Sequence, residues 1–176
     1  MPKKMSVNTG NAGEHLVMAE LLARGYHAFM ADRGNPSYDI SVFKDGKYSL
    51  LRVKTTTNGV IQYSTKKDGV TIFLDVQSKS DFVVIVNFSQ RNKLKDKKSI
   101  VSGADFYIVP TRVVDDALKK CHKFWHRFPR RDGEKRKITK HRSLGLHGSA
   151  TKTNIARGFD KEWEKYHDEK GWKQLD

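Results

Sequence analysis

Three polar side chains in the first third of the chain could together hold a metal ion and assist a hydrolysis. Glu14 and Asp39 carry carboxylates, the oxygen ligands that hard divalent cations such as Mg²⁺ prefer. Lys54 carries an ammonium group, which can position an attacking water or stabilise charge in a transition state. Hydrolysis of a phosphodiester with a metal ion needs such a set. Taken singly, each of these residues is more often structural than catalytic.

The local sequence predicts a helix and two paired strands that could position these residues. A helix is predicted over residues 12–24, with Gly25 as its C-cap, because apolar residues recur at three- and four-residue intervals. Its predicted inner face consists of Glu14, Val17, Met18, Leu21 and Leu22. Strand-like runs follow at residues 26–30, 38–43 and 48–55. An Asp45-Gly46 turn between the last two runs predicts a hairpin, in which Asp39 and Lys54 can meet at one end of the sheet.

The rest of the chain predicts an α/β fold, with a mixed central sheet flanked by helices. The apolar run at residues 81–88 is typical of a strand covered on both faces, and residues 105–109 predict another strand. Thr111 is the predicted cap of a second helix. The apolar positions of that helix are Val114, Ala117, Leu118, Cys121 and Trp125. A last helix is predicted over residues 154–170, with Phe159, Trp163 and Tyr166 at helical spacing. Residues 58–79 are left unassigned, with a strand or a buried turn at 70–76.

The charge of the chain predicts a polyanionic partner. Lys and Arg total 34 of the 176 residues against 20 Asp and Glu, a formal net charge of +14. Nucleic acid is the usual polyanion for such a chain, because each neutralised phosphate also releases a counterion. No long amphipathic helix with a basic face is apparent, so a membrane partner is not expected. The single cysteine, Cys121, allows neither an internal disulfide nor a cysteine-based zinc site, and a cytoplasmic, reducing location is expected.

Much of the excess charge lies in residues 119–142, which hold eleven Lys or Arg against Asp132 and Glu134. The candidates for nucleic-acid contact are Arg130, Arg131, Lys135, Arg136, Lys137, Lys140 and Arg142. The alternative is a merely solvated tail. The predicted organisation is a polar arm (residues 1–11), an α/β core (12–128) and a basic C-terminal extension with a terminal helix (129–176). His122 and His126 have a spacing that can hold zinc, but an exposed helix face is the preferred interpretation because no third ligand is evident.

Three stretches carry a resemblance to a known family: GNAGEHLVMAELLARGYHAF, NPSYDISVF and KYSLLRVKTTTNG. They resemble the core of the PD-(D/E)XK nucleases, in particular resolvase-like and mobile-element endonucleases. The resemblance covers about residues 8–60 well and becomes weak after about residue 128. It implies a restriction-endonuclease-like core that cleaves double-stranded or branched DNA, with Mg²⁺ or Mn²⁺ held by Glu14 and Asp39 and with Lys54 beside them. Resemblance to dimeric resolvases also implies a homodimer.

One position departs from the family pattern. The residue two before Lys54 should be acidic or Gln, and it is Arg52. Strand alternation places Arg52 on the same face as Lys54, and a guanidinium has no lone pair with which to bind a metal. Three hypotheses remain: an inactive site, a site that recruits another acid such as Asp32 or Glu20, or a site in which Arg52 binds phosphate.

The leading prediction of function is therefore a divalent-metal-dependent DNA endonuclease. The alternative is a catalytically degenerate nuclease fold that binds DNA without cleaving it. A basic RNA-binding or ribosome-associated protein is a third class, which only the charge favours.

Overall fold

The structure is a computed structural model that describes residues 3–32, 35, 37–64, 80–88, 103–130, 132–137, 141–146 and 163–176. The helices are α1 (Lys3–Ala23), α3 (Thr111–Arg127), the 3₁₀ turn η2 (Glu164–Tyr166) and α5 (Asp168–Trp172). The strands are β1 (His27–Met30), β2 (Ile40–Lys44), β3 (Lys47–Thr56), β4 (Val60–Ser64), β5 (Phe82–Asn87), β6 (Asp105–Pro110) and β7 (His141–Gly145).

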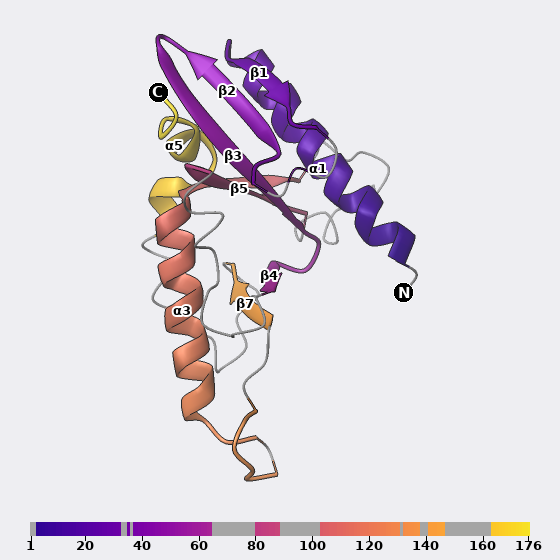
Figure 1. Cartoon of the computed structure of the whole chain (residues 1–176), viewed down its shortest axis with the longest axis vertical. Helices are drawn as coiled ribbons and strands as arrows, with labels where there is room; N and C mark the ends of the chain where they lie inside the picture. Colours follow the sequence, from indigo (N-terminus) through magenta and orange to yellow (C-terminus); the bar gives the residue numbers. More distant parts are fainter. Residues whose placement is uncertain are drawn as a thin grey trace.

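A five-stranded mixed sheet forms the centre of the molecule (Figure 1). Its strand order is β1-β2-β3-β5-β6, in which β3 and β5 are parallel and all other neighbours are antiparallel. The predicted turn joins β2 to β3, and both of its central residues adopt positive φ, 51° at Asp45 and 81° at Gly46. A second sheet pairs β4 with β7, far apart in the sequence. The predicted fold class, a mixed sheet flanked by helices, is confirmed.

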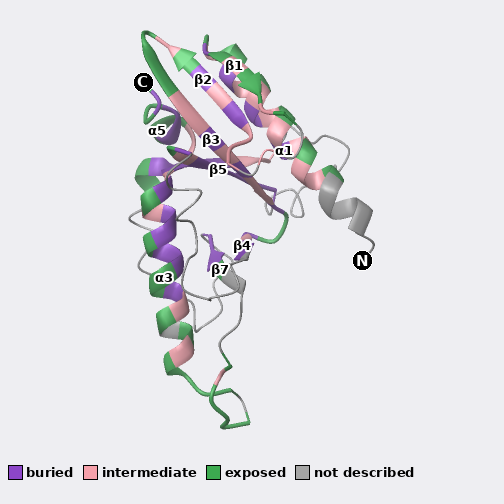
Figure 2. Cartoon of the chain, in the orientation of Figure 1, coloured by how far each residue is buried: buried purple, intermediate pink, exposed green. Residues whose placement is uncertain are grey.

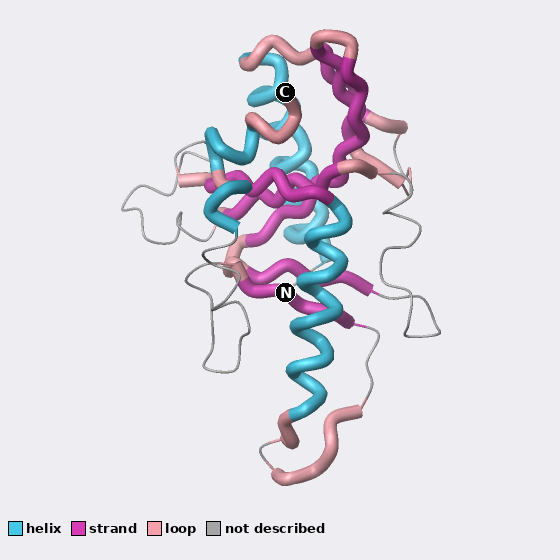
Figure 3. The backbone as a smooth tube through the Cα atoms, turned by 90° about the vertical axis from the view of Figure 1, so that its left-hand side faces the viewer, coloured by secondary structure: helices cyan, strands magenta, loops and turns pink. Residues whose placement is uncertain are grey.

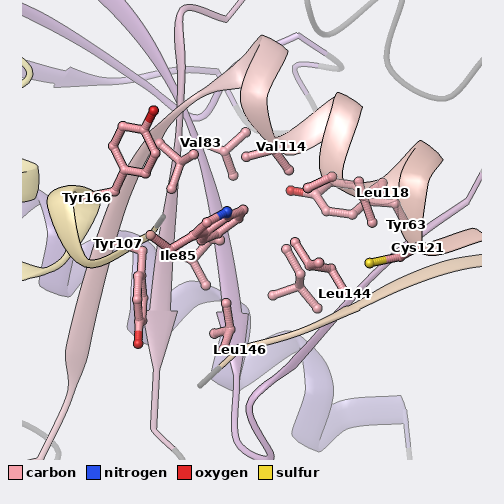
Figure 4. Close-up of a cluster of buried hydrophobic side chains, with 14 residues drawn as sticks. Tyr63, Val83, Ile85, Tyr107, Val114, Leu118, Cys121, Leu144, Leu146 and Tyr166 are labelled. Atoms are coloured by element: carbon pink, nitrogen blue, oxygen red, sulfur yellow. The ribbon is translucent and has the colours of Figure 1, made fainter. Parts of the chain in front are cut away.

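Two hydrophobic clusters cover the two faces of the central sheet. On one face, Val17 and Leu21 of α1 pack with Trp172 of α5 against the sheet. On the other face, α3 and the β4–β7 pair enclose the cluster drawn in Figure 4. Alternate residues of β5 belong to each cluster, and the strand is buried along most of its length (Figure 2). The prediction of a strand covered on both faces is therefore correct for residues 82–87.

The two long helices differ from their predictions at their starts. Helix α1 begins at Lys3 rather than at residue 12, so residues 3–11 are helical and not a separate arm. The sequence did not predict a helix over residues 3–11 because these residues are mostly polar and lack an apolar repeat. At α3, Thr111 is the first helical residue, and its hydroxyl lies 3.2 Å from that of Ser80 instead of capping the helix. Trp125, expected on the buried face, is 36% exposed because α3 continues beyond the sheet (Figure 3).

The residues after 128 also contribute to the core. The helix predicted over residues 154–170 lies partly outside the described residues. Phe159 and residues 70–76 lie wholly outside them. The described part of the predicted helix is the turn η2 and the short helix α5, separated by His167, which forms a β-bridge with Tyr107. Trp172 belongs to the cluster under α1, so the core is not confined to residues 12–128. Among the described residues, no helix combines the length and hydropathy that crossing a membrane requires.

Candidate active site

A close contact between α1 and β3 positions Glu14. A methyl group added at Gly13 would lie 2.0 Å from Oγ1 of Thr55, so only glycine lets the helix backbone approach the strand this closely. Val17 and Leu21, in the next turns of α1, are fully buried and hold the helix against the sheet. This packing leaves Glu14 beside the strand, partly buried.

Asp39 is fixed by hydrogen bonds to the neighbouring strand. Its backbone N–H donates to the carbonyl of Leu51 at 2.8 Å, and its carbonyl accepts from the N–H of Ala31 at 2.8 Å. Its carboxylate Oδ2 accepts from the N–H of Val53 at 2.7 Å. Asp39 therefore continues the sheet one residue before β2, rather than lying in a loose turn.

Arg52 and Lys54 share one face of β3, as strand alternation predicts, while Leu51 and Val53 are buried under α1. The Nε atom of Arg52 lies 3.5 Å from Oδ2 of Asp39, the same oxygen that accepts the Val53 N–H. Arg52 thus lies beside the carboxylate of Asp39, at the sequence position where the resemblance described above calls for an acid or Gln.

These four side chains line one pocket of about 470 Å³. The described residues around it are Gly10, Glu14, Asp39, Arg52, Val53, Lys54, Thr55, Thr56, Thr57, Asn58, Val60 and Gln62. The structure thus brings together Glu14, Asp39 and Lys54, which lie far apart in the sequence. Among these described lining residues, only Glu14 and Asp39 are acidic.

The additional acids considered from the sequence do not complete the site. Asp32 and Glu20 are absent from the described lining residues. Glu20 instead pairs with Arg24, one helical turn away, at 3.4 Å. Neither Asp32 nor Glu20 therefore lines the pocket with Glu14 and Asp39.

Burial and like charges shift the ionisation of the pocket residues. Burial, and next the Asp39 carboxylate, raise the pKa of Glu14, while His15, Arg52 and Lys54 oppose this change. Burial, and next the Arg52 guanidinium, lower the pKa of Lys54, against the two carboxylates. The ammonium of Lys54 also lies 4.9 Å from the ring centre of Tyr63. The pocket therefore holds two carboxylates and two cations in a partly desolvated space.

Sequence reasoning missed one wall of the pocket, which β4 provides through Val60 and Gln62. The turn from β3 into β4 is held by Thr56, whose Oγ1 accepts from the N–H of Val60 at 3.1 Å. Gly59 in this turn has a φ of 72°. The Asn58-Gly59 pair is a turn signal, and the apolar residues that alternate after it could have indicated a strand.

The basic residues predicted to contact nucleic acid lie elsewhere. The described residues 128–130 and 132–137, which include Arg130 and Arg136, form the loop after α3, at the end of this helix that lies away from the central sheet (Figures 1 and 3). The Nε of Arg136 donates to the carbonyl of Phe128 at 2.9 Å, and its guanidinium stacks 4.4 Å from the ring centre of Trp125. Lys135 and Lys137 are exposed. Outside the described residues lie Arg131, Lys140 and the side chain of Arg142.

The two histidines of α3 adjoin each other without completing a metal site in the described part of the chain. The ring centres of His122 and His126 are 4.4 Å apart, and Trp125 packs against both. Neither histidine belongs to a described group of three metal-ligating side chains. The one such group consists of Asp105, His167 and Asp168, and none of these lines the pocket.

Comparison with known proteins gives the fold but no family. No family model matches the sequence, and no curated protein matches it significantly. The structure is similar to that of a bacterial homing endonuclease, with a TM-score of 0.50 and 13% identity over 95% of this chain and 88% of that chain. A Holliday junction resolvase from the archaeal hyperthermophile Archaeoglobus fulgidus has a TM-score of 0.40 and 13% identity, over 85% of this chain and 93% of that chain. The first similarity shows that the chain shares the fold of a nuclease.

Proposed function

We propose that this chain is a divalent-metal-dependent DNA endonuclease that hydrolyses phosphodiester bonds. The observation that carries the proposal is that Glu14, Asp39 and Lys54 line a single pocket. Three elements distant in sequence converge there, and at Gly13 the helix backbone approaches β3 closely enough to bring Glu14 to the strand. Such convergence is what a catalytic site requires and what a chance distribution of polar residues rarely produces.

The pocket residues fit a hard cation. Glu14 and Asp39 would hold Mg²⁺ or Mn²⁺, since carboxylate oxygens suit both ions. The bound ion would supply Lewis-acid stabilisation and an activated water. The raised pKa of Glu14 arises partly from Asp39, a repulsion that a shared cation would relieve. Lys54, whose ammonium is desolvated, would orient the attacking water or stabilise the charge of the transition state.

DNA is the proposed substrate because the chain carries a formal net charge of +14. Arg52 would contact a phosphate, for which its planar guanidinium is well suited. The exposed Lys135 and Lys137 at the far end of α3 would add contacts outside the pocket. A homodimer, with two pockets facing two strands, stays a prediction.

One observation favours a second candidate function, DNA binding without cleavage. The Nε of Arg52 lies 3.5 Å from Oδ2 of Asp39, and both side chains are mostly buried. A fixed positive charge this close competes with a metal ion for the same carboxylate. A catalytically degenerate nuclease fold would retain this ion pair and bind DNA through its basic surface.

Cleavage assays on plasmid, linear duplex and four-way junction DNA test the proposal. We expect weak cleavage with Mg²⁺ or Mn²⁺, because Arg52 competes with the metal ion for Asp39, and none with EDTA. Glu14→Gln and Asp39→Asn should each lower the rate by about 100-fold or more, and Lys54→Met by about 10²- to 10⁴-fold. Glu20→Gln, on the same helix but outside the pocket, is the matched control and should cleave normally.

The same variants distinguish the two candidate functions. DNA binding in EDTA, measured by fluorescence anisotropy, should be little changed by Glu14→Gln or Lys54→Met. Binding without any metal-dependent cleavage by the unaltered chain would favour the second function. Cleavage that persists in both Glu14→Gln and Asp39→Asn would place the reaction outside this pocket.

A further inference from the structure

A second group of metal-ligating side chains lies where the end of the described chain meets β6. Asp105 begins β6, and His167 and Asp168 lie between η2 and α5. One ligand atom from each lies within 4.8 Å of the others. The Nε2 of His167 is 3.2 Å from Oδ2 of Asp168 and 4.0 Å from Oδ1 of Asp105.

The protein holds both carboxylates by their other oxygens. Oδ1 of Asp168 accepts the N–H of Phe106 at 2.9 Å, and Oδ2 of Asp105 lies 3.4 Å from the amide nitrogen of Asn87, which donates to it. The remaining oxygens, Oδ2 of Asp168 and Oδ1 of Asp105, are those nearest His167. Hydrogen bonds of this kind orient ligating side chains in known metal sites.

The imidazole of His167 is oriented toward the same point. Its ring packs 4.7 Å from that of Tyr107, and a β-bridge joins the backbones of these two residues. Its Nε2 atom is shielded from solvent and makes no hydrogen bond in the described part of the chain. Its nearest acceptors are the two carboxylate oxygens on Asp168 and Asp105, so the three groups converge on one point without a well-aligned hydrogen bond from this nitrogen.

We propose that Asp105, His167 and Asp168 form a second cation site, which binds a divalent transition metal of the Zn²⁺ or Mn²⁺ class. One imidazole nitrogen with two carboxylate oxygens suits these ions, whereas Ca²⁺ takes oxygen ligands alone. Neighbouring atoms bound at about 2.0–2.2 Å to one tetrahedral zinc ion lie about 3.3–3.6 Å apart. The separations of 3.2 Å and 4.0 Å bracket this spacing, so small side-chain movements would bring all three ligand atoms to it.

The site would fasten the segment around α5 to the central sheet. Asp105 belongs to β6, while the other two ligands precede Trp172, which is buried in the cluster under α1. A shared ion would therefore link the segment to the strand on which it packs. This role is structural and independent of the pocket around Glu14 and Asp39, since none of the three ligands lines that pocket.

Zinc titration of a chain without the pocket carboxylates tests the proposal. In Glu14→Gln/Asp39→Asn protein stripped with EDTA, calorimetry should give one Zn²⁺ per chain. Zinc at about 100 times its Kd should raise the Tm by about 5–11 °C. Adding His167→Gln should abolish both effects, and adding Asp105→Asn should weaken zinc binding by about tenfold or more.

The histidine pair of α3 supplies the matched control. His122→Gln/His126→Gln in the same background should bind zinc normally. Unchanged zinc binding after His167→Gln, or no zinc binding before it, would overturn the proposal. If His167→Gln does not fold, as judged by circular dichroism in EDTA, Asp105→Asn becomes the deciding variant. That variant leaves the imidazole in place, and normal binding by it would equally overturn the site.

Discussion

At the scale of single residues, Arg52 decides what the pocket can do. It lies opposite Asp39, one residue beyond the register that pairs Ile40 with Leu51. Its charge adds to burial in lowering the pKa of Lys54, and it opposes the rise in the pKa of Glu14. Arg52 therefore changes the ionisation of both proposed catalytic groups. A metal ion bound at the two carboxylates would have to tolerate this charge.

Arg52→Glu should therefore strengthen metal binding and raise cleavage. Two unit charges about 4 Å apart interact by about 4 kcal/mol at an effective dielectric constant near 20, an upper limit because water screens the pocket. A fraction of this energy changes metal affinity by more than tenfold, at about 1.4 kcal/mol per factor of ten. Mn²⁺ binding, measured by calorimetry, should tighten accordingly, with cleavage measured in parallel.

Arg52→Gln is the control for this substitution, because it removes the charge without adding a carboxylate ligand. It should improve metal binding less than Arg52→Glu does. Two results would contradict the prediction. Strong Mg²⁺-dependent cleavage by the unaltered chain would show that the site tolerates Arg52. Tighter metal binding by Arg52→Glu without any gain in cleavage would show that the site has lost more than one function.

At the scale of elements, the contact between α1 and β3 sets the depth of the pocket. Glycine is a poor helix former, yet α1 holds both Gly10 and Gly13. An added methyl at Gly13 meets Oγ1 of Thr55 at 2.0 Å and its Cβ at 3.1 Å, so a change of rotamer at Thr55 relieves only part of the contact. At Gly10 nothing lies within 4 Å.

The two glycines should thus respond in opposite directions to alanine. Gly13→Ala should lower the free energy of unfolding by up to about 2 kcal/mol, since overpacking costs about 1–3 kcal/mol and alanine regains about 1 kcal/mol of helix propensity. It should also impair cleavage by moving Glu14 away from Asp39. Gly10→Ala should stabilise the chain by about 0.5–1 kcal/mol. Urea denaturation measures both, and equal effects at the two positions would contradict this account of the packing.

At the scale of the whole molecule, the described C-terminal segment is held to α1 and β2 by ion pairs as well as by Trp172. Arg24, just after the end of α1, makes two hydrogen bonds to the carboxylate of Glu169, at 2.9 and 2.5 Å. Oδ1 of Asp176 accepts from the hydroxyl of Tyr26 at 2.6 Å and from Lys44 at 2.9 Å. The hydrogen bond from Arg24 lowers the pKa of Glu169, and those from Tyr26 and Lys44 lower the pKa of Asp176.

These shifts predict a loss of stability in acid. A carboxyl whose pKa is lower in the folded chain than in the unfolded chain stabilises the folded chain. This stabilisation is complete above the unfolded pKa, which is 4.5 for Glu169 and 3.8 for Asp176, and it is lost as the pH falls below that value. Glu14, with its raised pKa, contributes with the opposite sign. The urea midpoint should therefore fall from pH 6 to about pH 3.

The pH dependence can be assigned with substitutions in a Glu14→Gln background. Asp176→Asn and Arg24→Gln should each reduce the fall of the urea midpoint between pH 6 and about pH 3. Asp176→Asn removes a stabilised carboxylate, and Arg24→Gln removes the partner of Glu169. Asp32→Asn, at an exposed position outside these ion pairs, is the matched control. An equally steep decline in all of these variants would mean that other carboxyls cause the acid sensitivity.

Local sequence determined the parts of this protein that depend on neighbouring residues. The Asp45-Gly46 turn fixed the β2–β3 hairpin because both residues tolerate positive φ. Strand alternation then placed Arg52 and Lys54 on one face, and the apolar run of residues 82–87 predicted a strand between two layers. The convergence of Glu14, Asp39 and Lys54 followed from the order of these elements and the resemblance they carry.

Only the tertiary structure decided what depends on contacts between distant segments. The pairing of β4 with β7 adds Gln62 to the pocket, and no local pattern could specify a partner so far along the chain. The same holds for Trp172 in the core and for Asp105 beside His167. The spacing of apolar residues predicts which face of a helix or strand is buried, but not which other element covers that face. That choice follows from packing over the whole chain, and it added lining residues such as Gln62 to the pocket beyond those that the sequence predicted.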